Sequence, residues 1–158
     1  MNAHARTPLI VDCRVPPRAR APAARLMARW ADAALGARGA GCEMALQVVS
    51  APRMRALNRR YRGKDRPTNV LSFPANPAPG VKPRPLGDVL ICAAVLRREA
   101  RSQGKSEQAH WAHLVVHGTL HLLGYDHDQE RAASRMERRE VAVLRRLGFA
   151  NPYRQGRS

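Results

Sequence analysis

The stretch His117-Gly-Thr-Leu-His121-Leu-Leu-Gly124-Tyr-Asp-His127 brings three histidines close together in the chain. His117 and His121 are four residues apart, so on a helix they project from one face with their Cβ atoms about 6 Å apart. Gly124 can end this helix because glycine adopts the left-handed conformation without steric cost. The chain then turns, and His127 can return as a third ligand. Three neutral nitrogen ligands with an open fourth position are typical of a catalytic zinc site.

The residue after the first histidine separates this pattern from that of the zinc peptidases. Those enzymes carry a glutamate there, which is the general base that activates water. The chain has Gly118 at this position. A bound metal can still lower the pKa of water to about 7, but the peptidase base is absent from its place. We interpret Gly118 as a packing position.

His113 is a rival third ligand, because it lies one helical turn before His117. A helical trio of residues 113, 117 and 121 would span about 12 Å, at 1.5 Å per residue. That length is too great for three bonds of about 2 Å to one ion. We therefore interpret His113 as a structural or supporting residue, and His110 and His4 as solvent residues.

The predicted histidine helix is apolar almost all round, from Trp111 to Leu123, and begins after Ser106 as its N-cap. Such a helix must be largely buried, and buried histidines need partners, which supports the metal interpretation. Tyr125 is interpreted as a packing residue. Asp126 has two equal interpretations: it accepts the free N–H of an imidazole, or it caps the turn.

The hydrophobic pattern of the rest of the chain predicts a small α+β domain. It has one mixed sheet of about four strands and about five helices, with the metal site at the end of a buried helix. Residues 74–85 are rich in proline and are interpreted as a surface connector. The predicted strands cover residues 9–13, 42–50, 70–73 and 88–92. The other predicted helices cover 22–35, 52–61, 93–103 and, with Asp128 as its cap, a final helix to Leu147.

Length and composition predict one domain over residues 1–158, with 1–8 and 154–158 as flexible tails. No apolar run approaches the roughly 20 residues of a membrane span, and we expect no membrane partner. The N-terminus lacks the apolar core of a secretory signal. Three scattered cysteines form no metal-binding pair and predict reduced thiols in the cytoplasm.

The formal net charge is +16, from 28 basic and 12 acidic residues. This charge favours a polyanionic partner such as nucleic acid. Only two Trp, three Tyr and two Phe are present, so recognition should rest on phosphate contacts more than on base stacking. The arginines of the last helix, which pair partly with Glu137 and Glu140, are interpreted as surface residues.

A basic cluster lies at the end of the second predicted helix and in the loop that follows. The turn-forming sequence Pro67-Thr68-Asn69 comes next and can hold one arginine firmly. Such an arginine could stabilise negative charge on a scissile phosphate, although the pattern alone does not separate Arg62 from Arg60. The candidate RNA-binding residues of the cluster are Arg59, Arg62, Lys64 and Arg66.

The segment from His113 to His127 resembles the signature of the YbeY family of bacterial endoribonucleases. The segments Leu57–Pro74 and Gly87–Cys92 strengthen the resemblance, and order and spacing match from about residue 42 to residue 153. The resemblance implies a metal-dependent, single-strand-specific endoribonuclease. Its implied roles are 16S rRNA 3′-end maturation and ribosome quality control. The implied partners are rRNA and the small ribosomal subunit, with a ribosomal protein or ribosome-associated GTPase as a further candidate.

The resemblance also assigns the site residues. The family's three metal histidines fall on His117, His121 and His127, and its phosphate-facing arginine falls on Arg62. We expect one Zn²⁺ ion, although three histidines also accept other divalent metals, and we expect Arg62 and His117 to be catalytic. The general base is unassigned between metal hydroxide, an RNA 2′-hydroxyl activated by the ion, and Asp126.

Two other functions stay open. One is a zinc hydrolase of peptide or small-molecule substrates, which the positive charge and Gly118 disfavour. The other is a non-catalytic rRNA-binding ribosome assembly factor whose metal is structural. Cleavage of single-stranded RNA by the purified protein distinguishes both from the endoribonuclease.

Overall fold

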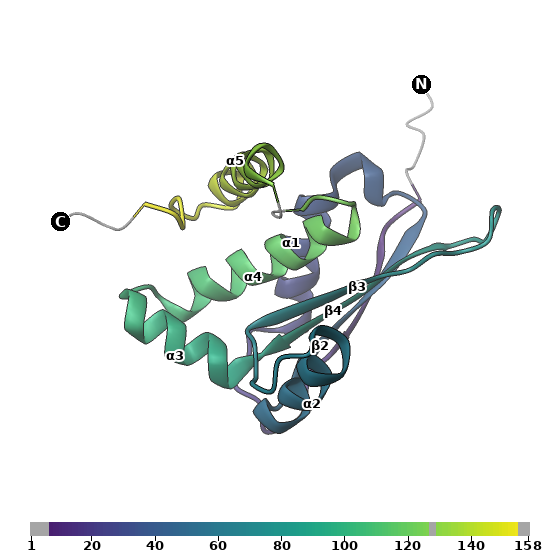
Figure 1. Ribbon diagram of the computed structural model, residues 1–158. Helices are drawn as coiled ribbons and strands as arrows, with labels where there is room; N and C mark the ends of the chain where they lie inside the picture. Colours follow the sequence, from purple (N-terminus) through teal and green to yellow (C-terminus); the bar gives the residue numbers. More distant parts are fainter. Residues whose placement is uncertain (1–6, 127–128, 155–158) are drawn as a thin grey trace.

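The computed structural model describes residues 7–126 and 129–154. A four-stranded sheet forms the centre of the protein, and helices cover it on both faces (Figure 1). The strands are β1 (Ile10–Arg14), β2 (Cys42–Val49), β3 (Val70–Pro74) and β4 (Arg84–Cys92). The helices are α1 (Ala24–Leu35), the short η1 (Gly36–Gly39), α2 (Ala51–Arg62), α3 (Ala93–Gln103), α4 (Glu107–Leu122) and α5 (Glu130–Arg146).

The strand order is β1-β2-β4-β3. β1 and β2 are parallel, as are β2 and β4, whereas β3 runs antiparallel to β4. The sheet is therefore mixed, and together with its five α-helices it confirms the predicted α+β class. β3 lies at one edge of the sheet and, with β4, extends as a hairpin beyond the body of the protein (Figure 1).

β4 is longer than predicted, because it begins at Arg84 and not at Asp88. The early part of the strand contains Pro85 and Gly87, which are poor strand residues, and this hid it in the sequence. Gly87 has a φ of 132°, and a Cβ there would lie 2.2 Å from the Phe73 carbonyl oxygen. Glycine at this position therefore allows the two strands to approach each other.

The two faces of the sheet pack against different helices, because successive residues of a strand point to opposite sides. One face packs mainly against α1 and α4, through residues that include Met44, Leu46, Val89 and Ile91. The other face carries Leu71, Leu90 and Cys92, which pack with Met54 of α2 and Val95 of α3. Met44, Leu46 and Val48 alternate along β2 and are all buried on the first of these faces.

α4 is buried between the sheet, α1 and α5, as its apolar sequence predicts. Ser106 caps it by accepting a hydrogen bond from the Ala109 N–H at 3.1 Å. Gly118 faces β3 and β4, where a Cβ would lie 2.6 Å from Val89 Cγ1 and 3.1 Å from Val70 Cγ2. The packing interpretation of Gly118 is therefore confirmed, and it allows the histidine helix to lie close to the sheet.

The remaining predictions concern the termini, the cysteines and the last helix. Thr7 is described and its carbonyl accepts a hydrogen bond from the Gly41 N–H at 3.0 Å, whereas residues 1–6 and 155–158 lie outside the described residues. All three cysteines are free thiols, and Cys42 and Cys92 are buried. The N-cap of α5 is Gln129, and the predicted cap Asp128 lies outside the described residues. Within the described part of the chain, no helix has the length and apolar character to cross a membrane.

We expect Gly118→Ala to lower the free energy of unfolding by about 1–2 kcal/mol. The added methyl group meets two β-branched side chains that cannot easily move, and overpacking of this kind costs about 1–3 kcal/mol. Alanine's higher helix propensity returns up to about 1 kcal/mol. Urea denaturation measures the difference. The double variant Gly118→Ala/Val89→Ala makes room for the methyl group, and should therefore lose less than the sum of the two single variants. Unchanged stability of Gly118→Ala would contradict the close packing.

Candidate metal centre

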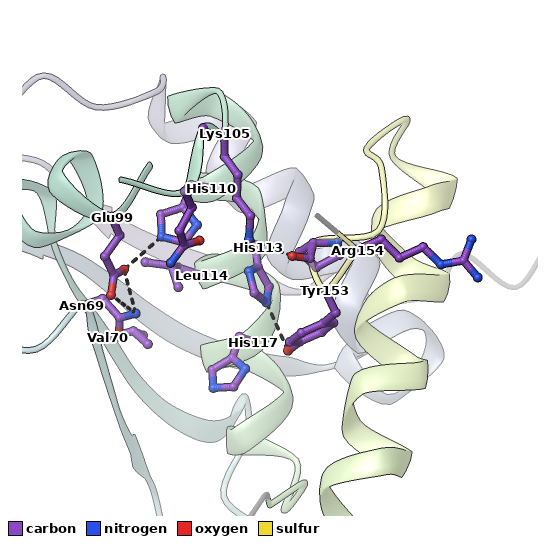
Figure 2. A pocket seen from close by; sticks show the side chains of 13 residues that line it. Asn69, Val70, Glu99, Lys105, His110, His113, Leu114, His117, Tyr153 and Arg154 are labelled. Atoms are coloured by element: carbon purple, nitrogen blue, oxygen red, sulfur yellow. Dashed lines mark hydrogen bonds and ion pairs between the residues drawn. The ribbon is translucent and has the colours of Figure 1, made fainter. Parts of the chain in front are cut away.

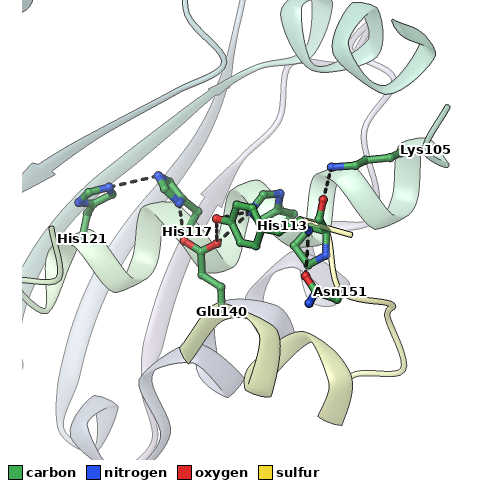
Figure 3. Close-up of polar contacts among 8 residues, drawn as sticks. Lys105, His113, His117, His121, Glu140 and Asn151 are labelled. Carbon is green, nitrogen blue, oxygen red and sulfur yellow. Dashed lines mark hydrogen bonds and ion pairs between the residues drawn. The ribbon is translucent and has the colours of Figure 1, made fainter. Parts of the chain in front are cut away.

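His117 and His121 lie one turn apart on α4, and their Nε2 atoms are 3.2 Å apart (Figure 3). Two nitrogen ligands bonded at 2.0–2.1 Å to one tetrahedral ion lie about 3.3 Å apart. The two imidazoles therefore have the separation that a shared metal ion requires. The third predicted ligand, His127, lies outside the described residues.

A buried carboxylate lies on the other side of His117. Glu140 of α5 has no exposed surface, and its Oε1 accepts a hydrogen bond from His117 Nδ1 at 2.5 Å (Figure 3). Since the carboxylate only accepts, the proton of His117 is on Nδ1 and the lone pair is on Nε2, toward His121. A carboxylate that orients a metal-binding histidine in this way is a common feature of zinc sites.

Glu140 has two further hydrogen-bond donors. His113 Nε2 donates to its Oε2 at 3.0 Å, and the hydroxyl of Tyr153 donates to the same oxygen. Burial alone would raise the pKa of Glu140, but the hydrogen bonds from His113 and His117 outweigh burial and lower the pKa to about 2. The carboxylate is therefore ionised at neutral pH. Burial is also the main cause that lowers the pKa of His113, so this imidazole is neutral there.

His113, His117 and Glu140 themselves form a group that could hold a metal ion, with ligand atoms within 4.8 Å of one another. The described residues thus offer two positions for an ion around His117. One lies at Nε2 with His121, and the other lies at Nδ1 with His113 and Glu140. An ion at Nδ1 would have to replace the proton that now joins His117 to the Glu140 carboxylate. An ion at Nε2 would replace the proton shared between His117 and His121 and would leave the hydrogen bond to Glu140 in place.

Two predictions about this region are wrong. Glu140 was expected at the surface, but it is fully buried beneath the histidine helix. The sequence held a signal, because Met136, Glu140, Val143 and Leu144 share the i, i+4, i+7, i+8 spacing of one helix face, and this face is buried. His110 was expected in solvent, but it is 3% exposed and bonded through Nε2 to Glu99 Oε1 at 3.0 Å.

A cleft of about 500 Å³ brings the histidine pair together with other predicted site residues. β3 contributes Ser72, whose hydroxyl donates to the Gly118 carbonyl at 2.9 Å, and the turn after α4 contributes Tyr125 and Asp126. Tyr125 also packs against the main core, as expected. The cleft is lined by Arg62, Thr68, Asn69, Val70, Ser72, Pro74, His117, His121, Gly124, Tyr125 and Asp126.

Arg62 reaches this cleft from the end of α2. Gly63 ends the helix in the left-handed conformation, with a φ of 69°. The loop that follows is fixed from beneath by the buried Asn58, whose Nδ2 donates to the Arg66 carbonyl at 2.8 Å and whose backbone carbonyl accepts from the Lys64 N–H. The loop is therefore held on both sides of its first turn by contacts with Asn58.

The other basic residues of the cluster are divided between two neighbouring hollows. Lys64 and Arg66 line a hollow that also contains Arg62. Arg59 lines a different one, next to the ion pair between Arg55 and Asp65. Only Arg62 of the four predicted RNA-binding residues lines the histidine cleft.

A second cavity, of about 480 Å³, lies between His117 and the C-terminal segment (Figure 2). Its walls include Glu99, His110 and His113, and the C-terminal segment closes it with Tyr153. Glu99 accepts hydrogen bonds from both His110 and the Asn69 side chain. Sequence reasoning did not identify this cavity, because its residues come from four separate parts of the chain.

The fold and the cleft together define a small α+β domain with a candidate histidine metal centre and an arginine at the same cleft. Comparison with known proteins agrees with this class. The family model of endoribonuclease YbeY matches residues 18–148, and so includes α1, where the sequence resemblance had not extended. The chain belongs to the endoribonuclease YbeY family, whose name describes enzymes that hydrolyse RNA internally.

Curated relatives cover most of the chain. The endoribonuclease YbeY of Methylococcus capsulatus is 55% identical over 126 residues, which are 80% of this chain and 83% of the relative. The protein of the same name from Alkalilimnicola ehrlichii is 53% identical over 141 residues, with 87% and 85% covered. That of Halorhodospira halophila is 48% identical over 140 residues, with 87% and 91% covered.

A solution structure of a protein from Thermotoga maritima has the same fold, with a TM-score of 0.57. It covers 92% of this chain and 99% of its own, at 20% identity. The likeness at this identity concerns the fold alone.

We expect Glu140→Gln to weaken divalent-metal affinity by about 10–100-fold, as is usual when the residue that orients a metal histidine is changed. Glutamine has one acceptor oxygen and one donor NH₂ group, so it cannot accept from His117 on one side and from His113 and Tyr153 on the other. The hydrogen bonds that fix the tautomer of His117 are therefore weakened. Competition with a chromophoric chelator measures Zn²⁺ affinity. Glu137→Gln, at an exposed position one turn earlier on α5, is the matched control. Equal affinity of wild type and Glu140→Gln would show that the carboxylate does not support the ion.

Proposed function

We propose that this protein is a metal-dependent endoribonuclease that cleaves single-stranded rRNA in the cytoplasm. Its proposed role is 16S rRNA 3′-end maturation and ribosome quality control, on the small ribosomal subunit, with a ribosomal protein or ribosome-associated GTPase as a candidate partner. The observation that carries the proposal is the shared cleft of Arg62, His117 and His121. The net charge of +16 and membership of an endoribonuclease family support RNA as the substrate.

His117 and His121 would hold one Zn²⁺ ion through their Nε2 atoms, and His127 would be the third ligand. The 3.2 Å between the two Nε2 atoms supports this position, and Glu140 would keep His117 in the required tautomer. A bound divalent ion supplies Lewis acidity toward a phosphate oxygen and a lowered pKa of water. Nitrogen ligands favour zinc over the hard cations, and metal analysis of the purified protein identifies the ion.

Arg62 would bind the scissile phosphate. Its guanidinium is always charged and its planar N–H groups match two phosphate oxygens. Because Gly63 and Asn58 fix the chain that follows it, the backbone of Arg62 is held beside the cleft. Less rearrangement would then be needed to bring its charge to the phosphate, which makes stabilisation of a transition state more effective. Lys64 and Arg66, in the adjoining hollow, would bind neighbouring phosphates.

The size of the cleft supports a single-stranded substrate. A volume of about 500 Å³ is in the range of small-ligand sites, so it suits one phosphate with its nucleoside and not a base-paired helix. Asp126 lines the same cleft and carries an exposed carboxylate. We propose it as the acceptor of the proton that the attacking hydroxyl loses. The alternatives need no side-chain base, because a bound ion would itself lower the pKa of the attacking water or of the RNA 2′-hydroxyl.

Zn²⁺ binding by the variants His121→Ala and His113→Ala distinguishes the two positions for an ion around His117. We expect His121→Ala to abolish stoichiometric Zn²⁺ binding, whereas His113→Ala should retain the ion with reduced affinity, because His113 would act only through Glu140. Metal content after dialysis, measured by mass spectrometry, gives the answer, and circular dichroism checks the fold. Zinc retained by His121→Ala and lost by His113→Ala would move the ion to the Glu140 side.

We expect Arg62→Ala to slow cleavage of a labelled 16S 3′-end RNA by about 10²–10³-fold, as for the loss of one transition-state donor, with metal content unchanged. Arg25→Ala, an exposed arginine on α1, removes the same charge elsewhere and should change the rate by less than about threefold. Variants purified in parallel control for contaminating ribonuclease.

RNA that is bound but not cut by the wild type would favour a non-catalytic assembly factor. Chelator-sensitive turnover of a peptide substrate would favour the metallohydrolase.

A further inference from the structure

The segment that follows α5 returns to the metal centre and is held there by contacts with distant parts of the chain. Phe149 packs its ring against the edge of Trp30 in α1, with centroids 5.8 Å apart. The Pro152 carbonyl accepts a hydrogen bond from Lys105 Nζ at 2.8 Å (Figure 3). The Tyr153 N–H donates to Asn151 Oδ1 at 2.9 Å. The backbone of the segment is therefore fixed immediately before its contact with the histidine helix.

Tyr153 combines an exposed ring with a buried hydroxyl. The side chain is 43% exposed, but its hydroxyl donates to Oε2 of the fully buried Glu140. The ring also meets His113 edge-on, with centroids 5.3 Å apart and planes at 83° (Figure 2). Packing alone does not require such an arrangement, since much of the ring remains in water. The specific part of the contact is the hydrogen bond.

This hydrogen bond lies one step from the proposed ligand. Oε2 of Glu140 is held by Tyr153 and His113, while Oε1 holds His117 Nδ1. A partial rotation of the carboxylate group would move Oε1 away from Nδ1 and break the hydrogen bond to His117. Two donors on Oε2 oppose that rotation, so each of them helps to keep Nε2 of His117 directed toward His121.

We propose that Tyr153 is a positioning residue of the metal centre: its hydroxyl fixes the Glu140 carboxylate, and the carboxylate fixes the imidazole of His117 that binds the ion. The inference rests on the proposed ion position between His117 and His121. The C-terminal segment would then help to position the metal ligand His117, although the segment lies outside the cleft that holds the histidine pair and Arg62. Because coupling between two sites is reciprocal, a bound ion should also stabilise the docked segment.

The test compares Tyr153→Phe with Tyr61→Phe in the full-length protein. Each variant removes one hydroxyl from an exposed tyrosine, and Tyr61 packs its ring on Phe73 of β3. We expect Tyr153→Phe to weaken Zn²⁺ affinity, measured by chelator competition, by about 3–10-fold, less than the effect of a residue that contacts the ligand directly. Its Co²⁺ complex should also show an altered visible absorption spectrum. Tyr61→Phe should match the wild type in both measurements.

A double-variant cycle separates positioning from general destabilisation. If the hydroxyl acts through the carboxylate, Tyr153→Phe should have little further effect on Zn²⁺ affinity in a Glu140→Gln background. Unchanged affinity of the single variant, an equal loss in both backgrounds, or a wild type that binds no ion would each overturn the proposal. Because no RNA is used, a protein that binds the ion as predicted but cleaves no RNA would overturn the proposed function alone.

Discussion

The buried carboxylate of Glu140 is the interaction on which the site depends. A charge with no exposed surface is costly unless it is hydrogen-bonded, and Glu140 meets this condition with donors from His113, His117 and Tyr153. These donors come from α4 and from the C-terminal segment, so the carboxylate joins three parts of the chain at one point. The same hydrogen bond that satisfies Glu140 places the proton of His117 on Nδ1 and directs its Nε2 lone pair toward His121.

The position of α4 on the sheet is the second constraint. Gly118 allows the helix to lie against Val89 and Val70, which brings His117 and His121 to the edge strand β3. α2 packs on the opposite face of the sheet, yet its last residue, Arg62, lines the same cleft. Thr68 and Asn69, from the loop that leads into the edge strand β3, line it too. An arginine and a histidine pair from opposite faces thus line one cleft, with their positions set by rigid elements on either side.

Much of the fold could be predicted from hydrophobic periodicity, and the predictions failed where long-range packing overrides local pattern. The strand Cys42–Val49 and the helix Ala93–Gln103 follow directly from alternation and from glycine stops. The first half of β4 was missed because Pro85 and Gly87 are poor strand residues that are accommodated only by pairing with β2 and β3. Glu140 was assigned to the surface because a charged residue usually belongs there, and only a buried partner on another helix changes that preference.

The sequence by itself determined the spacing of the two histidines of α4 in the candidate centre and the burial of their helix. The four-residue spacing of His117 and His121 sets their separation through the helical repeat alone, and the apolar helix around them requires burial. Only the tertiary structure decided which nitrogen of His117 carries the proton, because that depends on Glu140 from another helix. It also decided that Arg62, and not Arg59, lines the cleft, because the direction of a side chain at a helix end depends on the loop that packs beneath it. Local spacing is encoded within a few residues, whereas partners that lie far apart in the chain meet only when the core is packed.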